Sequence, residues 1–481
     1  MLWRPTAFGL RVLLFFEQEL IVWDCSLEGG MDLGDIKKVL SDAGVTPSRQ
    51  LGQNFLCDAK VARGIVDQLH PDKEDIVVEC GPGTGALTVH LVGRVKKVIL
   101  IEFDARLAEY QTSKYADNAD VEVHFADAAR FDIRQLFKYG PIKLLGNLPY
   151  SAGGAIMRNF MKRPTMVSRA VLMLQKEFID RIIAVPRTKD YGVLTLRMQS
   201  EWMSKPVMLV PPDAFTPPPK IDSTVMVCEP KPEAEQPVYD ARLFDELIRR
   251  GFSQRRKQIK KQLPDHLPWE DVAAKVGLKL TARAEEISLE DWIEITRLYD
   301  DNPLKDIPQK DDEVFDVVDE NDEVVSQETR KKVHAQNLTH RAVHVLVFNK
   351  NKDILLQKRS ILKDKFPGCW DSSAAGHLDT GESYDDCVVR ELAEELGIEG
   401  VDTQKIAKIP ASEKTGFEFI ELHLARYDGA LRFPCSEVST AEWFTMEQVR
   451  EWVIARPEDF ASGFVECWNL FEDKMGAARS E

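Results

Sequence analysis

"VVECGPGTGALT" occupies Val77–Thr88 and joins an apolar run to a loop that contains three glycines. The β-branched residues predict a buried strand, and the G-x-G-x-G spacing lets the backbone approach a bound group closely. A helix that begins after such a loop favours polar or anionic groups at its N-terminus. The stretch therefore predicts a ligand pocket at the end of a strand. Its candidate contacts are Glu79, Gly81, Gly83 and Gly85.

Two acidic residues follow at the ends of the next two apolar runs, Glu102 in LIEFD and Asp127 in FADAARFD. In a parallel sheet, an acid at the second strand suits ribose hydroxyls, and one at the third suits an adenine amino group. A glycine loop alone also fits a dinucleotide, and both acids could instead cap helices. Their order after the loop favours an S-adenosylmethionine pocket.

The alternation of element types predicts an α/β fold class. From residue 58 to about 203, β-rich apolar runs alternate with amphipathic stretches, which indicates a Rossmann-like parallel sheet covered by helices. A Pro-rich segment and a basic helical stretch come next, then a Pro-containing charged linker, and then a second alternating set. The expected organisation is an N-terminal extension at 1–30 that is disordered or precedes the natural start, a methyltransferase-type domain at 31–205, a helical RNA-binding lobe at 206–300, a linker at 301–312 and a second domain, of α/β/α type, at 313–475.

Charge and cysteine content narrow the class of protein. Of a formal net charge of −16, residues 301–481 carry −15, so the preceding part is close to neutral. The eight cysteines include no C-x-x-C pair, which argues against a zinc site or a disulfide framework and fits a reducing cytoplasm. The apolar patch within residues 1–30 is broken by charges, so we expect no membrane span. We expect a cytoplasmic monomer.

The fourth apolar run ends in GNLPY, which places Asn147 close to Pro149 and Tyr150. An adenine amino group is a weak nucleophile because its lone pair is delocalised into the ring. The Asn147 side-chain oxygen and the Pro149 carbonyl can accept its hydrogens, while Tyr150 offers a stacking face for an extruded base. Direct displacement of a methyl group then depends mainly on alignment. NLPY alone also fits a turn, but after the glycine loop it predicts methylation of an adenine amine.

Residues from about Thr46 to Asp300 resemble the ribosomal RNA adenine dimethyltransferase family. The resemblance rests on LGQNFL, ECGPGTGALT, IEFDARL, NLPY, YGVLTLRMQ, FTPPPKIDSTV, FSQRRKQIKKQL and RAEEISLEDW. It implies an enzyme that uses S-adenosylmethionine to dimethylate two adjacent adenosines near the 3′ end of 16S (small-subunit) ribosomal RNA in a pre-30S particle. A ribosome-assembly factor whose methylation is incidental is the alternative. One departure is SAGGAIM, which has Gly153 and Gly154 where the family commonly carries a Ser/Thr-Pro step.

The resemblance also implies roles for single residues. Gln53, Asn54 and Leu56 edge the cofactor pocket, Phe215 stacks on the target base, and Arg255, Arg256 and Lys257 contact RNA phosphates. The bland interpretation of the basic run, a solvated helix face, remains open.

Residues 371–400, DSSAAGHLDTGESYDDCVVRELAEELGIEG, place a glycine, a glutamate and an Arg-Glu-Leu-Ala-Glu-Glu run at fixed spacing. On a helix, Glu391, Glu394 and Glu395 are related by three and four residues, so their carboxylates share one face. Three like charges repel unless a hard cation neutralises them, as Mg²⁺ bound to a diphosphate does. We expect Glu382 and Arg390 to pair and hold the loop against the helix. The candidate metal residues are Gly376, Glu391, Glu394 and Glu395.

The same stretch matches the pattern G-x5-E-x7-R-E-U-x-E-E-x-G-U, and residues 313–475 resemble a Nudix hydrolase domain. VVDENDEVVSQETRKKVH, LTHRAVHVLVFN, LLQKRS and KDKFPGCWDSSAAGH are similar to the isopentenyl diphosphate isomerase-like branch. Those isomerases carry a catalytic cysteine where this chain has Ala375, and their box is degenerate whereas this one is complete. The resemblance therefore implies Mg²⁺-dependent hydrolysis of a small diphosphate, with an isomerase-like or RNA-end-processing module as alternatives.

Further metal ligands are implied by the same resemblance. His340 and His377 match metal-site histidines of the isomerases, although both could be structural. A later glutamate usually joins the metal site, and Glu418, Glu421 and Glu437 are candidates that the sequence leaves unranked. The linker is short and polar, and no sequence feature predicts a rigid interface between the two enzymes.

Overall fold

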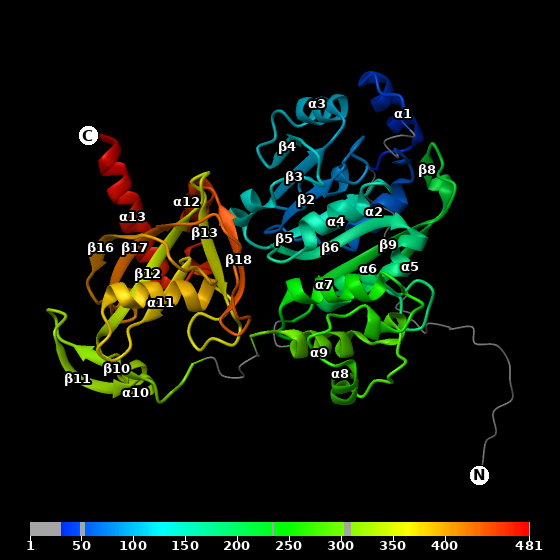
Figure 1. The fold of residues 1–481 in the computed structure, drawn as a ribbon. Helices are drawn as coiled ribbons and strands as arrows, with labels where there is room; N and C mark the ends of the chain where they lie inside the picture. The colour runs from blue at the N-terminus through cyan, green and yellow to red at the C-terminus, as the bar shows by residue number, and fades with distance from the viewer. Residues whose placement is uncertain (1–29, 49–52, 233–234, 303–308, 481) are drawn as a thin grey trace, which may run out of the picture.

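The computed structural model describes residues 30–48, 53–232, 235–302 and 309–480, which form two α/β bodies that lie side by side (Figure 1). The predicted N-terminal extension, except Gly30, and the centre of the predicted linker lie outside these ranges. Among the described helices, none combines the length and the apolar character needed to cross a membrane. The fold class expected from the sequence, a methyltransferase fold followed by a separate Nudix-type domain, is confirmed.

A seven-stranded sheet in the order β4-β3-β2-β5-β6-β9-β7 forms the first body. The first five of these strands run parallel and fall on β-rich apolar runs that the sequence predicts. β9 is antiparallel to both of its neighbours, β6 and β7. The order places β2 and β5 as neighbours, so the site expected at their carboxyl ends lies where the chain crosses over. The strand bounds are β2 Ile76–Cys80, β3 Lys97–Glu102, β4 Val121–Phe125, β5 Ile142–Asn147, β6 Val167–Gln175, β7 Trp202–Val210 and β9 Ser223–Pro230.

Helices cover both faces of this sheet, and each face has its own apolar core. One core is built on α1, α2, α3 and η1, and the other on α4, α5 and the 3-10 segment η2. A short pair, β1 with β8, closes the first face. The bounds are α1 Leu33–Asp42, β1 Phe55–Leu56, α2 Ala59–Asp67, η1 Thr88–His90, α3 Ala105–Lys114, η2 Ile133–Tyr139, α4 Gly153–Met161, α5 Lys176–Ile182, η3 Pro212–Ala214 and β8 Phe215–Thr216.

The helical lobe begins later than residue 206, where the sequence placed it. β7 and β9 extend the sheet as far as Pro230, and the register shift in β7 falls at Pro206, a residue that edge strands tolerate only at such irregularities. The helices of the lobe start at Ala241 and share a core with α6. Their bounds are α6 Val193–Glu201, α7 Ala241–Phe252, η5 Ile259–Lys261, α8 Trp269–Val276, η6 Ala284–Glu286 and α9 Leu289–Tyr299.

The second body is also built on a seven-stranded sheet, with β12 parallel to β17 at its centre. α11 covers one face, and α12 and α13 cover the other. A hairpin, β10–β11, and α10 form a small unit beside the sheet. The bounds are β10 Val314–Val318, β11 Val324–Thr329, α10 Arg330–Gln336, β12 His340–Phe348, β13 Ile354–Arg359, β14 Trp370–Asp371, β15 Ala374–His377, α11 Tyr384–Leu396, β16 Thr403–Ile409, η7 Glu413–Thr415, β17 Glu418–Arg426, β18 Val438–Phe444, α12 Met446–Ala455, η8 Pro457–Asp459 and α13 Ser462–Ser480.

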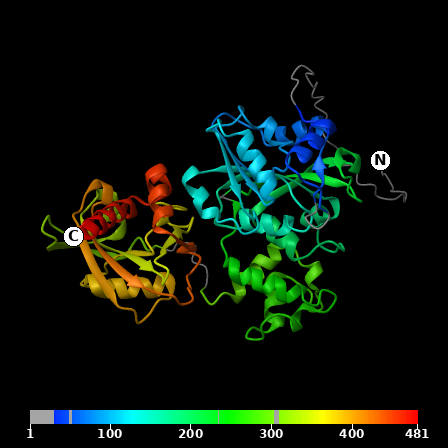
Figure 2. The ribbon, with the colours of Figure 1, turned by 90° about the horizontal axis from the view of Figure 1, so that it is seen from above.

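The two bodies are in direct contact, which the sequence did not predict. Seen from above, η2 of the first body reaches the second body (Figure 2). Phe137 in η2 is only 2% exposed because its ring lies in the apolar core of the second body. Lys138 pairs with Glu451 of α12 at 2.8 Å. A second contact joins α7 to the loop before β18, where the Arg242 guanidinium lies 4.2 Å from the Phe433 ring centroid.

Candidate active sites

A pocket opens at the carboxyl ends of β2, β3 and β5, and the glycine loop forms one wall. The backbone φ angles of Gly81, Gly83 and Gly85 are +70°, +55° and +90°, which only glycine adopts without strain. A side chain at position 83 would also crowd Phe55, whose ring atoms lie 3.2 Å from an added Cβ. The pocket is lined by Gln53, Asn54, Phe55, Leu56, Glu79, Gly81, Pro82, Gly83, Thr84, Ala86, Leu87, Glu102, Leu107, Asn147, Leu148, Pro149 and Tyr150.

Glu102 is the anchor between the loop and the next strand. Its carboxylate accepts hydrogen bonds from the Gly83 backbone N–H at 2.8 Å and from those of Phe103 and Asp104 at 2.9 Å. Burial raises the pKa of this carboxyl, and the three backbone donors oppose that rise. The backbone therefore fixes the position of the Glu102 carboxylate, which can accept hydrogen bonds from polar groups of a ligand.

Glu79 lies at the floor of the pocket and is 1% exposed. The Thr88 hydroxyl donates to its carboxylate at 2.8 Å, and burial raises its pKa to about 7. Gln53 at the rim donates to the Asp104 carboxylate at 3.3 Å. Asp127, by contrast, does not line the pocket. Its carboxylate accepts a hydrogen bond from the Ala129 N–H at 2.9 Å, and 39% of its side chain is exposed.

Asn147 lines the pocket at the end of β5. Its amide nitrogen donates to the Asn54 backbone carbonyl at 3.2 Å, which fixes the amide plane and leaves the oxygen available as an acceptor. The Tyr150 hydroxyl is 3.0 Å from the Ser223 hydroxyl, and this contact holds the ring. Both residues line the pocket.

The Pro149 carbonyl is already occupied. It accepts hydrogen bonds from the backbone N–H groups of Ala152 at 3.0 Å and Gly153 at 2.8 Å, which uses both lone pairs to start α4. The Leu148 carbonyl, one residue earlier, accepts no hydrogen bond from the described part of the chain. Leu148 is therefore the better second acceptor for an amine.

Phe215 is not at the pocket. Its strand β8 pairs with β1, where it lies opposite Leu56, and its ring is 4% exposed within the core of that face. A base-stacking role for Phe215 stays a prediction that requires the ring to leave this core.

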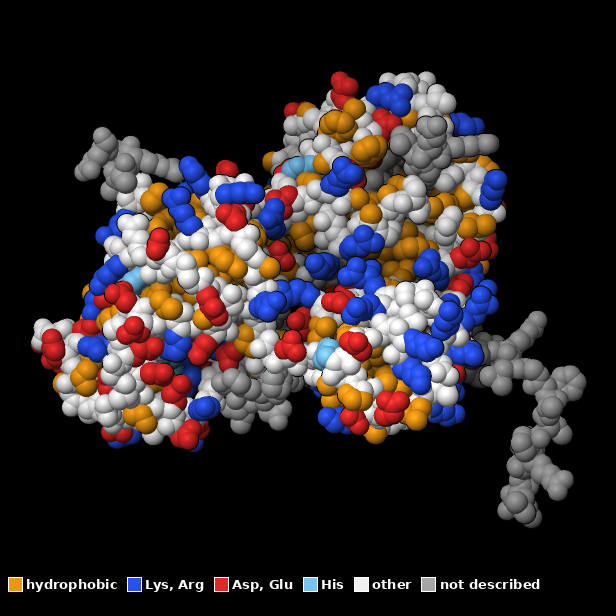
Figure 3. All heavy atoms as spheres, viewed as in Figure 1, with side chains coloured by type: hydrophobic (Ala, Val, Ile, Leu, Met, Phe, Trp, Pro, Cys, Tyr) orange, Lys and Arg blue, Asp and Glu red, His pale blue; other side chains and the backbone are white. Residues whose placement is uncertain are grey.

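In the basic run of the helical lobe, hydrogen bonds within the described part of the chain hold one of the three predicted RNA-contacting residues. The Arg255 guanidinium donates to the Glu285 carboxylate at 2.7 Å and to the Thr188 carbonyl at 2.5 Å. Arg256 and Lys257 are exposed. Figure 3 shows Lys and Arg side chains gathered on this lobe. A hollow on the same lobe, which the sequence analysis did not single out, is lined by Glu246, Arg249, Arg250, Ser253, Lys261 and Gln262.

In the second body, α11 begins at its N-cap Ser383 and ends at Gly397, whose φ is +66°. The predicted pair is confirmed, because Arg390 contacts Glu382 at 2.9 Å. Arg390 also donates to the His377 carbonyl at 2.9 Å, so the loop is tied to the helix at two points.

The three glutamates of α11 do not share one face. Glu391 and Glu395 point toward the sheet and are 7% and 5% exposed, while the Glu394 side chain is 64% exposed and lies 3.3 Å from Arg390. Successive helix residues differ by about 100° around the axis, so Glu394 and Glu395 cannot both face the sheet. Glu395 accepts hydrogen bonds from the Ala375 N–H at 3.0 Å and the Gln357 amide at 2.9 Å.

Burial and the neighbouring Glu395 raise the pKa of Glu391 to about 8, and burial raises that of Glu395. Two buried carboxyls that resist ionisation are a donor set that a divalent cation stabilises. The residues therefore fit the Mg²⁺ site expected from the sequence, with Glu394 at its edge.

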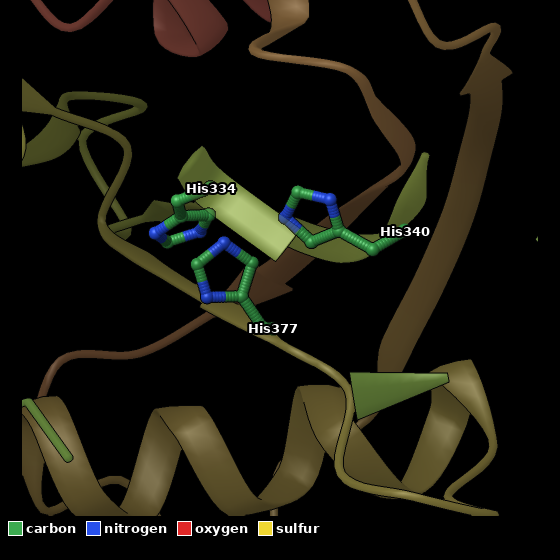
Figure 4. Close-up of side chains that lie close together, drawn as sticks. All are labelled: His334, His340 and His377. Carbon is green, nitrogen blue, oxygen red and sulfur yellow. The ribbon is translucent and has the colours of Figure 1, made fainter. Parts of the chain in front are cut away.

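Three histidines form a second cluster on the other face of β15 (Figure 4). His334 of α10, His340 of β12 and His377 of β15 each offer a ring nitrogen, and these atoms all lie within 4.8 Å of one another. The Glu418 carboxylate is 3.0 Å from His377 Nε2 and 3.6 Å from His340 Nε2. The buried His340 Nε2 has no hydrogen-bond partner within the described residues. The arrangement fits a metal ion bound by three imidazoles and a carboxylate.

The sequence had missed His334 and had not ranked the glutamates. Glu421 pairs with Lys405 at 2.5 Å and Glu437 pairs with Lys363, which leaves Glu418 as the glutamate in the histidine cluster. Burial lowers the pKa of His334 to about 3 and that of His377 to about 4, so both rings are neutral, as metal ligands must be. The six-residue spacing of His334 and His340 around an Asn-containing turn was the available signal.

Comparison with known proteins divides the chain in the same way. Residues 46–301 match the family described as Ribosomal RNA adenine dimethylase, and residues 338–462 match the NUDIX domain. Ribosomal RNA small subunit methyltransferase A of Bordetella avium is 38% identical over 252 residues, which are 52% of this chain and 93% of that protein. The protein of the same name from Chromobacterium violaceum is 35% identical over 249 residues, 52% and 94% of the two chains. A dimethyladenosine transferase structure from Plasmodium falciparum has a TM-score of 0.44 and 26% identity, covering 51% of this chain and 96% of that one.

Proposed function

Because the chain belongs to the ribosomal RNA adenine dimethylase family, we propose that its first body transfers methyl groups from S-adenosylmethionine to two adjacent adenosines near the 3′ end of small-subunit ribosomal RNA. The observation that carries this proposal is the Asn147 amide. Its nitrogen is engaged by the Asn54 carbonyl, so its oxygen is available in a pocket that the glycine loop also lines. The expected partner is the pre-30S particle, with Arg256 and Lys257 toward RNA phosphates.

The bound cofactor would supply an electrophilic methyl group, with Glu102 and the Gly81–Gly85 loop as the residues that hold it. The Asn147 oxygen and the Leu148 carbonyl would each accept one hydrogen of the adenine amine, which frees the nitrogen lone pair from the ring. With its lone pair freed, the nitrogen would be the nucleophile for the methyl group that the cofactor supplies, and the amine proton would leave to solvent. Tyr150, held by Ser223, would stack on the extruded base.

For the second body, we propose hydrolysis of a small diphosphate compound with Mg²⁺. The supporting observation is the buried pair Glu391 and Glu395 beside Gly376, which would hold the metal ion that neutralises the diphosphate. Ala375 replaces the cysteine of the isomerase-like branch, which favours hydrolysis over isomerisation. An isomerase-like activity is the second candidate function, because the three histidines lie together beside Glu418. RNA-end processing is disfavoured by the −15 charge of residues 301–481.

Two assays with the full chain test these proposals. Unmethylated small-subunit particles are incubated with labelled S-adenosylmethionine, and the modified nucleosides are mapped by mass spectrometry. Two adjacent dimethyladenosines are expected, and tight particle binding without methyl transfer would instead favour an assembly factor. Nucleoside and isoprenoid diphosphates are then screened with Mg²⁺ for phosphate release, and an isomerised product without phosphate release would favour the isomerase-like alternative.

A further inference from the structure

Gln357 is a buried polar residue in the apolar layer between the second sheet and α11. It lies on β13 and is only 1% exposed. Leu355, two residues earlier on the same strand, packs into the core beneath α11, so Gln357 faces the same helix. Its neighbours across the ladder are Asp371 and Ala441. A polar group in such a place costs stability unless it has partners, so the contacts of this amide indicate what the site holds.

The nitrogen end of the Gln357 amide contacts a proposed metal ligand. Its Nε2 donates to Glu395 Oε2 at 2.9 Å, and the Ala375 backbone N–H donates to the same oxygen at 3.0 Å. Two protein donors therefore fix this carboxylate through one of its oxygens. The other oxygen, Oε1, remains available to a cation.

The oxygen end of the amide is buried and accepts no hydrogen bond from the described residues. Because Oε1 and Nε2 share one carbon atom, this oxygen lies a short distance from the Glu395 carboxylate. Hard cations accept amide oxygens together with carboxylates. A neutral oxygen also adds a ligand without adding a third negative charge to the buried pair Glu391 and Glu395.

We propose that Gln357 belongs to the Nudix metal site, where its Nε2 orients Glu395 and its Oε1 is a further oxygen ligand for the Mg²⁺ ion. This rests on the function proposed for the second body, in which Glu391 and Glu395 hold that ion. The two ends of one amide thus have separate tasks. A side chain without an oxygen fails at both, whereas a carboxylate at this position keeps the oxygen and loses only the donor.

The test measures Mg²⁺ affinity of the full chain by calorimetry, with no substrate present. Mg²⁺ is the probe because the histidine cluster suits transition metals instead. Gln357→Met keeps the length of the side chain but has no amide, and Gln357→Glu keeps an oxygen. The matched control is Gln327→Met, because Gln327 lies in the same body and also donates to a carboxylate, that of Asp316 at 3.0 Å. Melting temperatures in the presence of a chelator show whether each variant is folded.

Gln357→Met should weaken Mg²⁺ binding at least about tenfold, whereas Gln357→Glu should bind Mg²⁺ within about threefold of the wild type or more tightly. Gln327→Met should leave the affinity unchanged. Wild-type affinity in Gln357→Met would overturn the inference. So would an equal loss in the Met and Glu variants, because Gln357 would then act only through the donor that orients Glu395.

A measurement on the unaltered chain decides the question if Gln357→Glu fails to fold. Glutamine labelled with ¹³C at Cδ gives a carbonyl signal for Gln357, identified by its loss in Gln357→Met. This signal should shift when Mg²⁺ saturates the site, and an unshifted signal would overturn the inference. A wild-type chain that binds Mg²⁺ but hydrolyses no diphosphate would instead refute the proposed function alone.

Discussion

Gly376 and Glu391 meet so closely across the space between β15 and α11 that a Cβ at position 376 would lie 1.9 Å from Glu391 Oε1. The glycine of the Nudix pattern is thus a packing requirement of the metal site. The neighbouring residue, His377, faces the other side of the strand, so one short strand separates two candidate metal sites.

Replacement of this glycine provides the first prediction. Gly376→Ala should displace the Glu391 carboxylate, lower stability by about 1–3 kcal/mol and abolish Mg²⁺-dependent diphosphate hydrolysis. Gly400→Ala is the control, because Gly400 has a φ of +66° but no atom within 4 Å of an added Cβ. It should cost about 1 kcal/mol through backbone strain while hydrolysis persists. Full hydrolysis in Gly376→Ala would remove Glu391 from the metal site.

Asn147→Ala should reduce methyl transfer at least about a hundredfold while S-adenosylmethionine affinity changes less than about threefold. The reason is that Asn147 is assigned to the amine and Glu102 to the cofactor. Tyr150→Phe keeps the ring but loses the 3.0 Å contact with Ser223, so only a modest loss of activity is expected. Calorimetry and labelled-methyl incorporation measure the two effects, and parallel losses of binding and turnover would contradict the assignment.

The basic run should separate into a structural and an RNA-contacting part. Arg255→Ala should lower the melting temperature, because Arg255 ties Glu285 and the Thr188 carbonyl together. Arg256→Ala with Lys257→Ala should leave stability unchanged and reduce the slope of log affinity against log salt by roughly one to two, one ion for each lost phosphate contact. An unchanged slope in the double variant would return this run to a solvated helix face.

The sequence predicts those parts of the two sites whose residues lie close together along the chain. The glycine loop, the NLPY tetrapeptide and the Nudix pattern each place their residues within one short stretch of the chain, so their spacing predicts contacts such as that of Glu382 with Arg390. The position of Glu394 was predicted wrongly. A spacing of three and four residues places the glutamates on neighbouring parts of the helix circumference but does not say which of them faces the sheet.

Contacts between segments that lie far apart in the sequence could not be predicted, because no local spacing relates their residues. Phe137 has the sequence character of an ordinary core residue, and nothing near it shows that its partners lie more than 200 residues later, at Trp370, Phe444 and Trp452. The choice of Glu418 over Glu421 and Glu437 likewise depends on which lysines lie close by in space.

The raised pKa of Glu391 predicts a pH dependence of stability in metal-free protein. Its folded value is about 8 against an ordinary 4.5, so the folded state holds a proton that the unfolded state releases. Stability should therefore be greatest below about pH 4.5 for this group and fall as pH rises through about 8, by at least about 1 kcal/mol. Urea unfolding with a chelator from pH 5 to 9 measures this. Glu391→Gln should flatten the profile, and a wild-type profile in that variant would contradict the assignment.

The histidine cluster should bind a different metal from the glutamate pair. Imidazole suits transition metals, whereas Mg²⁺ prefers oxygen ligands, so His334, His340, His377 and Glu418 should hold a Zn²⁺- or Mn²⁺-like ion while Glu391 and Glu395 bind Mg²⁺. Elemental analysis of the purified full chain should find close to one equivalent of transition metal. His340→Ala should lose that metal, whereas His124→Ala, in the other body, should retain it.

Because β15 lies between the two sites, Glu391→Gln should leave the transition-metal content intact and weaken only Mg²⁺ dependence. If Glu391→Gln also releases the transition metal, the two clusters form one joint site rather than two.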